Sequence, residues 1–151
     1  MPYCTPRRQT TLDDPRHGVA IAAMKNRQSA KIQEFAHTLS RAGLVGLDDQ
    51  ARALGLSRST AWTIISASHK STGISPAIID RMLASSSLPS SLRVKIIEYV
   101  EERAAGLYGH NRAQRRRFVE ALASNPLAHR RLGHFALLEP DMDVEEIAAA
   151  S

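Results

Sequence analysis

Apolar residues recur at three- and four-residue intervals along most of the chain, which is the period of α-helices that bury one face. This spacing predicts helical structure over residues 19–42, where Ser29 is expected to cap a separate helix over 30–42 that ends at Gly43. Further helices are expected over 47–54, 57–65, 76–84, 91–108 and 112–123, with only short segments after Asn125 and Pro126. No alternating pattern typical of strands stands out, so the sequence predicts an all-α protein.

Two of the expected helices, 47–54 and 57–65, are separated by a single tight turn. Gly55 can take the positive φ that such a turn requires, and Ser57 is well placed to cap the second helix. Six apolar side chains of the pair are expected to share a small core: Ala51, Leu54, Leu56, Ala61, Ile64 and Ile65. This arrangement predicts a helix-turn-helix, in which the second helix enters the major groove of DNA.

Residues 56–65, followed at compatible spacings by Ala67-Ser68-His69 and Ile74-Ser75-Pro76, resemble the DNA-binding headpiece of the lac-repressor family. The resemblance covers only residues 47–84, and it implies a lambda-repressor-like DNA-binding unit. Nothing in the chain resembles the large sensor domain of that family, so sugar sensing is not implied.

The resemblance also implies roles for side chains of the second helix and of the loop after it. Arg58 and Ser59 match the pair that sets base specificity. Thr60 matches a phosphate contact, and His69 matches a loop contact beside the groove. The predicted DNA-binding residues are Ser57, Arg58, Ser59, Thr60, Trp62, Thr63, His69 and Lys70.

The residue types on the second helix point to the same chemistry. Arg58 can bond a guanine bidentately, and such a pair is worth about 1–3 kcal/mol of discrimination between bases. Trp62 and Thr63 stand where the family usually has Ser and Arg, so its base preference does not transfer. Two interpretations of Trp62 stay open: a rim residue packed on a neighbouring helix, or a flat contact on a thymine methyl or sugar-phosphate.

The net charge of the chain is +5, and it is unevenly distributed. Residues 1–47 carry seven Lys or Arg against three acidic residues, and residues 93–135 carry nine against four. Residues 136–151 carry five acidic residues and no basic one. A basic body suits a polyanion such as DNA. Ordinary solvated arginines are the alternative, above all for the run 115–117, which can also grip the DNA backbone or pair with the acidic tail.

Proline and serine clusters divide the chain into four parts. We expect a flexible basic arm over 1–18, a helix-turn-helix DNA-binding domain over 19–84, a helical extension over 91–135 and an acidic tail over 136–151. The extension carries an apolar stripe at the spacing of a helix-pairing seam: Ile97, Val100, Ala104 and Leu107. The stripe predicts a homodimer, and a core within one chain is the alternative.

The chain shows no pattern that predicts catalysis, a metal site or a cofactor. Cys4 is the only cysteine, which excludes an internal disulfide and a multi-thiolate zinc site and fits a reducing cytoplasm. His129 and His134 are five residues apart and do not share a helix face well enough to bind a metal, and no phosphate loop or nucleophile motif is present. We therefore expect no enzyme, no membrane segment and no evident small-molecule effector.

These observations predict a sequence-specific DNA-binding transcriptional regulator of a bacterium or phage, located in the cytoplasm, with double-stranded DNA as its partner. One alternative is a recombination or architectural accessory factor of a mobile element, which would bend DNA. Another alternative is a protein-interaction adaptor that uses the helix-turn-helix as a scaffold and shows no salt-dependent affinity for DNA.

Overall fold

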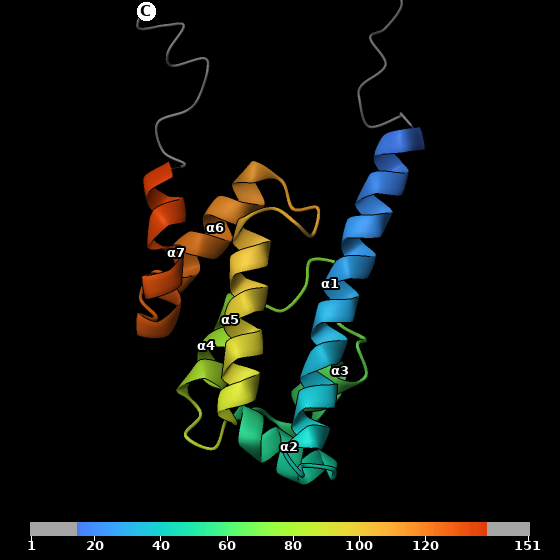
Figure 1. Cartoon of the computed structure of the whole chain (residues 1–151), viewed down its shortest axis with the longest axis vertical. Coiled ribbons are helices and arrows are strands. Elements are labelled where there is room, and N and C mark those ends of the chain that lie inside the picture. Colours follow the sequence, from blue (N-terminus) through green and yellow to red (C-terminus); the bar gives the residue numbers. More distant parts are fainter. Residues whose placement is uncertain (1–14, 139–151) are drawn as a thin grey trace, which may run out of the picture.

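The structure is a computed structural model that describes residues 15–138, and within this range it contains seven α-helices and no strand (Figure 1). The helices are α1 (Pro15–Arg41), α2 (Leu47–Leu54), α3 (Arg58–Ile65), α4 (Pro76–Ala84), α5 (Ser90–Ala104), α6 (Arg112–Leu122) and α7 (Pro126–Leu138). The prediction of an all-α protein is confirmed for this part of the chain. Most of the expected basic arm and of the expected acidic tail lies outside the described residues.

Helix α1 is uninterrupted over 27 residues, so the predicted start of a separate helix at Ser29 is wrong. The side chains of Gln28, Ile32, Phe35 and Leu39 are buried at spacings of four, three and four residues. One face of α1 therefore stays on the core throughout this segment. Because each further turn buries more apolar surface, the helix continues through the serine instead of ending before it.

The turn between α2 and α3 follows the signals predicted at Gly55 and Ser57, and α4 begins with a similar serine cap. Gly55 after α2 has a φ of 68°, in the left-handed region that the turn requires. Ser57 caps α3 and Ser75 caps α4, each through a side-chain oxygen that accepts a hydrogen bond from the backbone N–H three residues on. Pro76 then starts α4, where its missing N–H costs no helical hydrogen bond.

Helix α5 ends at Ala104 and not at Tyr108, the end predicted from the sequence. Gly106 adopts a φ of 83°, and the N–H of Leu107 bonds the carbonyl of Glu102 at 3.1 Å. This glycine therefore closes the helix while the apolar pattern continues past it. The apolar spacing alone thus overestimated the length of α5.

Helix α7 was not predicted, because Asn125 and Pro126 were expected to be followed only by short segments. Helix α6 already ends at Leu122, and Asn125 and Pro126 begin a new helix. Asn125 Oδ1 accepts hydrogen bonds from the N–H groups of Leu127 and Ala128, at 3.0 and 3.1 Å, as a helix cap does. Pro126 occupies the first position of α7, where proline is favoured.

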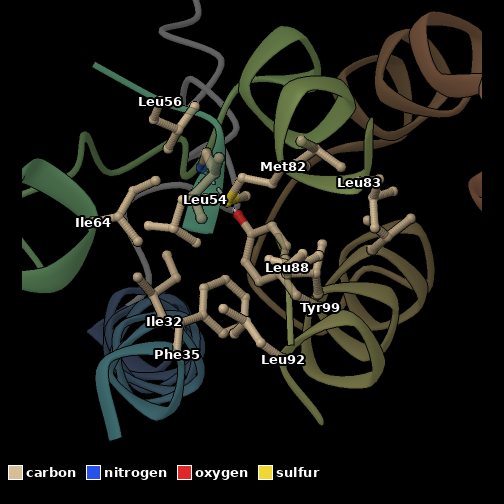
Figure 2. Close-up of a cluster of buried hydrophobic side chains, with 14 of the residues drawn as sticks. Ile32, Phe35, Leu54, Leu56, Ile64, Met82, Leu83, Leu88, Leu92 and Tyr99 are labelled. Atoms are coloured by element: carbon tan, nitrogen blue, oxygen red, sulfur yellow. Dashed lines mark hydrogen bonds between the residues drawn. The ribbon is translucent and has the colours of Figure 1, made fainter. Parts of the chain in front are cut away.

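Helix α5 is the central element of the molecule. It runs antiparallel to α1 on one side, packs on α6 and α7 on another and also contacts α4 (Figure 1). The close-up in Figure 2 shows Leu92 and Tyr99 of α5 beside Phe35 of α1, with Leu54 of α2 and Ile64 of α3 in the same cluster. The rings of Phe35 and Tyr99 meet edge to face, with centroids 6.0 Å apart.

The Ser-rich segment 85–91 does not separate two cores. Leu88 within it and Leu92 just after it belong to the same buried cluster as Leu54 (Figure 2). The residues predicted to form a DNA-binding domain and those predicted to form an extension therefore share one core.

The apolar stripe predicted within residues 91–108 is packed largely inside the chain. Val100 and Ala104 are buried, and Ile97 and Leu107 are half-buried against the same core. The prediction that this stripe faces a partner chain is therefore wrong, and its alternative, a core within one chain, is confirmed. Any pairing of two chains therefore has to use a surface that does not depend on the buried side chains of Val100 and Ala104.

Candidate nucleic-acid interface

The turn between α2 and α3 is held on two sides. The N–H of Leu56 bonds the carbonyl of Ala51 at 3.0 Å, and the N–H of Gly55 bonds that of Arg52 at 3.2 Å, the Schellman pattern of a glycine-ended helix. A Cβ on Gly55 would lie 3.1 Å from the Cβ of Ser85, so the turn also fits closely against the end of α4. These contacts fix the direction in which α3 leaves α2.

Helix α3 has one face in the core and one in solvent. Ala61 and Ile64 are buried, on the side where α3 packs against α1 and α2. Arg58, Ser59 and Trp62 are exposed on the outer side. The exposed fraction of Trp62 is 57%, so more than half of this large ring is open to an outside contact.

The hydroxyl groups at the start of α3 are engaged within the helix. Ser57 Oγ accepts a hydrogen bond from the N–H of Thr60 at 3.3 Å and donates one to Thr60 Oγ1 at 2.8 Å. Thr63 Oγ1 donates to the carbonyl of Ser59 at 3.1 Å. A hydroxyl proton of Ser57 or Thr63 must therefore rotate away from its present acceptor before it can bond a phosphate.

Arg58 lies close to Asp48 of α2, with Nη1 3.5 Å from Oδ1. The exposed fractions of the two side chains are 70% and 71%. An ion pair this exposed contributes at most about 1 kcal/mol. Arg58 is therefore held near the start of α3 but stays available to a stronger external partner.

A groove of about 410 Å³ beside α3 brings five of the eight predicted residues together. These five are Ser59, Thr60, Thr63, His69 and Lys70. The groove continues along the loop after α3 to Gly73, Ile74 and Ser75. The other three predicted residues do not line it: Ser57, Arg58 and Trp62.

His69 is half-buried at this groove, and Lys70 beside it is exposed. Burial lowers the pKa of His69, and its Nδ1 is buried without a hydrogen-bond partner. Burial therefore favours the neutral imidazole over the imidazolium. Lys70 supplies the positive charge at this edge.

The loop over residues 66–75 is fastened from behind by buried polar side chains. Gln28 of α1 donates to the carbonyl of Ser71 at 3.0 Å, and the Tyr99 hydroxyl of α5 accepts from the N–H of Ile74 at 3.1 Å. The Tyr99 hydroxyl also donates to Gln28 Oε1 at 3.1 Å. The loop after α3 is thereby held by α1 and α5, neither of which is next to it in the sequence.

Two further side chains complete this attachment. Arg103 Nη1 donates to the carbonyl of Ile74 and lies 3.3 Å from the Tyr99 hydroxyl, to which it also donates. His110 Nε2 bonds the carbonyl of Thr72 at 2.8 Å. We call the four side chains that hold the loop the loop clamp: Gln28, Tyr99, Arg103 and His110.

The loop clamp was not predicted from the sequence, although Arg103 and Gly73 are two signals for it. Arg103 follows Ile96 and Tyr99 on the buried face of α5, at spacings of three and four residues, where a charged group needs buried partners. Gly73 was a second signal. A Cβ there would lie 2.3 Å from both Gln28 Oε1 and the Tyr99 hydroxyl, so the clamp requires glycine at this position.

Among the side chains that the structure describes, no three His, Cys, Asp or Glu gather as a metal site requires, and none of the described helices is both long and apolar enough to cross a bilayer. Compared with known proteins, the chain matches no family model, no curated protein and no solved structure. The geometry of α3 and of the loop clamp therefore carries the functional inference.

Proposed function

We propose that the protein is a cytoplasmic, sequence-specific DNA-binding regulator of transcription, of bacterial or phage type. In this proposal α2 and α3 form a lambda-repressor-like helix-turn-helix, α1 covers its back and α3 enters the major groove. One observation carries the proposal: α3 is fixed at both ends, by the turn at Gly55 and by the clamped loop, while its outer face stays in solvent. A helix held in this way loses little conformational entropy when it meets a rigid partner.

The exposed side chains of α3 supply the contacts. Arg58 leaves its weak ion pair and bonds a guanine edge, and Trp62 lies flat on a thymine methyl or a sugar. Ser57 and Thr60, together with the first backbone N–H groups of α3, hold a phosphate at the helix N-terminus. The residues that line the groove beside α3 contact the adjoining DNA backbone, and Lys70 lies against a phosphate.

The proposal includes a homodimer, because one such unit contacts few base pairs and two half-sites raise both affinity and specificity. The surface that supports pairing lies between α5 and α7. Val94 and Leu127 are exposed there and line a groove with Ile97, beside charges of both signs such as Glu101 and Arg130. An apolar centre with mixed charges is complementary to a second copy of itself, as a two-fold interface requires.

Sedimentation tests the pairing surface separately from DNA binding. The wild-type chain should be dimeric at about ten micromolar, a range where weak dimers assemble, and Val94→Glu should make it monomeric. Val19→Glu is the matched control, because Val19 is also an exposed valine but lies on α1 outside this groove. A monomeric wild-type chain, or equal loss of dimer in both variants, contradicts the proposed surface.

Selection of bound sequences from a random duplex pool, with the full chain, tests the function. We expect one enriched motif, and an affinity for it that falls as salt rises because phosphate contacts release counterions. Absence of both an enriched motif and salt-dependent affinity contradicts DNA binding and favours the adaptor. Salt-dependent binding with bending but no motif contradicts sequence-specific regulation and favours an architectural factor.

A further inference from the structure

A cavity of about 410 Å³ lies between α5, α6 and the segment 72–76 that leads into α4. Its walls include Thr72, Pro76, Arg103, His110, Arg117 and Phe118. The volume falls in the range of small-molecule sites. Two of the wall residues belong to the loop clamp, and the DNA-binding proposal uses them only to position the loop.

Arg103 carries a buried guanidinium that pairs with no carboxylate of the described residues. The exposed fraction of Arg103 is 8%. Nη1 bonds neutral oxygens and the guanidinium carbon lies 4.0 Å from the centroid of the Phe118 ring, but Nε is buried without a partner. A buried, uncompensated charge is costly, and an anion in the cavity would offset it.

His110 presents a second buried nitrogen without a partner, and its exposed fraction is also 8%. Because the carbonyl of Thr72 can only accept, Nε2 carries the proton, and Nδ1 is the atom that lacks a partner. Burial lowers the pKa of His110, and the nearby cations Arg103 and Lys25 lower it further, against the hydrogen bond to Thr72. A bound anion would favour the imidazolium, whose Nδ1–H could then donate to it.

We propose that this cavity binds a small organic anion, with its carboxylate or phosphate group between Arg103 and His110 and its apolar part against Pro76. Arg117 lines the same cavity and is exposed, so it adds a second guanidinium from the solvent side. This set of groups favours an anion over a neutral or cationic ligand.

The position of the cavity gives the ligand a route to α3. Thr72 and Pro76 line the cavity, and the residues between them, 73–75, line the groove beside α3. A ligand that contacts this segment therefore acts on the loop that fixes the end of α3. That regulatory consequence rests on the proposed DNA-binding function, whereas binding of the anion does not.

Nuclear magnetic resonance of the full chain without DNA tests the site with three probes: inorganic phosphate, phenyl phosphate and benzoate. The anion with an apolar part should produce saturable shifts in the backbone amides of residues 72–75 and 110–118 and in the Nε–H of Arg103. Comparison of phenyl phosphate with benzoate identifies the preferred head group, and inorganic phosphate, which lacks an apolar part, should bind more weakly.

Two arginine variants on α6 provide the matched comparison. Arg117→Gln should weaken binding of the better probe by about three- to tenfold, as loss of one charge-assisted contact would. Arg116→Gln removes the same charge one residue away, outside the cavity lining, and should leave the affinity unchanged. Absence of saturable shifts with every probe, or equal weakening in both variants, overturns the proposal. Because no DNA is present, this result is independent of the test of DNA binding.

Discussion

At the scale of single residues, two glycines with nearly the same backbone conformation have very different surroundings. Gly43 has a φ of 87° and Gly73 a φ of 90°. A Cβ on Gly43 would meet nothing within 4 Å, whereas one on Gly73 would lie 2.3 Å from Gln28 Oε1 and from the Tyr99 hydroxyl. Both positions therefore strain an L side chain, but only Gly73 also lies against the loop clamp.

Alanine substitution at the two glycines separates these effects. Gly43→Ala should lower the free energy of unfolding by about 1 kcal/mol, the cost of left-handed backbone strain. Gly73→Ala should lower it by about 2 kcal/mol or more, because the clamp side chains must also move apart. Urea denaturation followed by circular dichroism measures both losses. Equal losses would mean that the clamp does not confine the loop.

His110 makes the stability of the fold depend on pH. Burial lowers its pKa from the ordinary 6.5, so the unfolded chain binds a proton at higher pH than the folded chain does. The free energy of unfolding therefore has its highest value, as far as His110 is concerned, above about pH 6.5, and it falls as the pH drops below that value. His69, whose pKa burial also lowers, contributes in the same direction.

We expect His110→Gln to reduce this loss of stability, because glutamine can keep a donor near the Thr72 carbonyl without a titratable ring. Urea midpoints at about pH 7.5 and about pH 5.5 measure the effect. His37→Gln is the control, since His37 is exposed on α1. If the wild type and His110→Gln lose the same stability between the two pH values, the burial argument for His110 fails.

At the level of helices and turns, the sequence correctly predicted the end of a helix where one residue has a single dominant local role. Gly55 and Ser57 set the α2–α3 turn, as predicted. It failed at Ser29, because serine is acceptable both as a cap and inside a helix whose face stays buried. Local preference could not decide between these roles, and tertiary packing did.

The candidate interface also has one part that could be predicted from the sequence and one part that could not. The outer face of α3 follows from helical spacing within ten residues, so the exposure of Arg58 and Trp62 could be predicted. The loop clamp depends on contacts between residues far apart in the chain, such as Ile74 with Tyr99 and Tyr99 with Gln28, which are 25 and 71 positions apart. No local pattern specifies such pairs, so the contacts that hold the loop could not be predicted from the sequence.

The role of α5 as a central element predicts the result of a truncation. A chain that ends at Ser90 lacks Leu92, Ile96 and Tyr99, which are fully buried against the helices before them. We expect this shortened chain not to fold, because the truncation removes several large side chains from the only core that the described residues show. A dispersed amide spectrum and cooperative unfolding of the shortened chain would contradict this expectation.

At the scale of the whole molecule, one hydrophobic core connects three surfaces with different chemistry. The outer face of α3, the cavity beside Arg103 and the exposed groove between α5 and α7 all belong to elements that pack on α5 or on its neighbours. DNA binding, anion binding and pairing of two chains are thus proposed for separate faces of one folded unit. The test of each surface substitutes residues of that surface and leaves the other two surfaces unchanged.

Fluorescence anisotropy with the selected duplex and a random duplex tests whether α3 recognises a DNA sequence. Arg58→Ala should weaken binding to the selected duplex by about ten- to a hundredfold, the worth of a bidentate guanine contact, and affect the random duplex much less. Arg116→Ala removes the same charge from α6 and should change both affinities slightly and alike. If Arg58→Ala and Arg116→Ala weaken both duplexes equally, binding is only electrostatic and α3 does not recognise sequence.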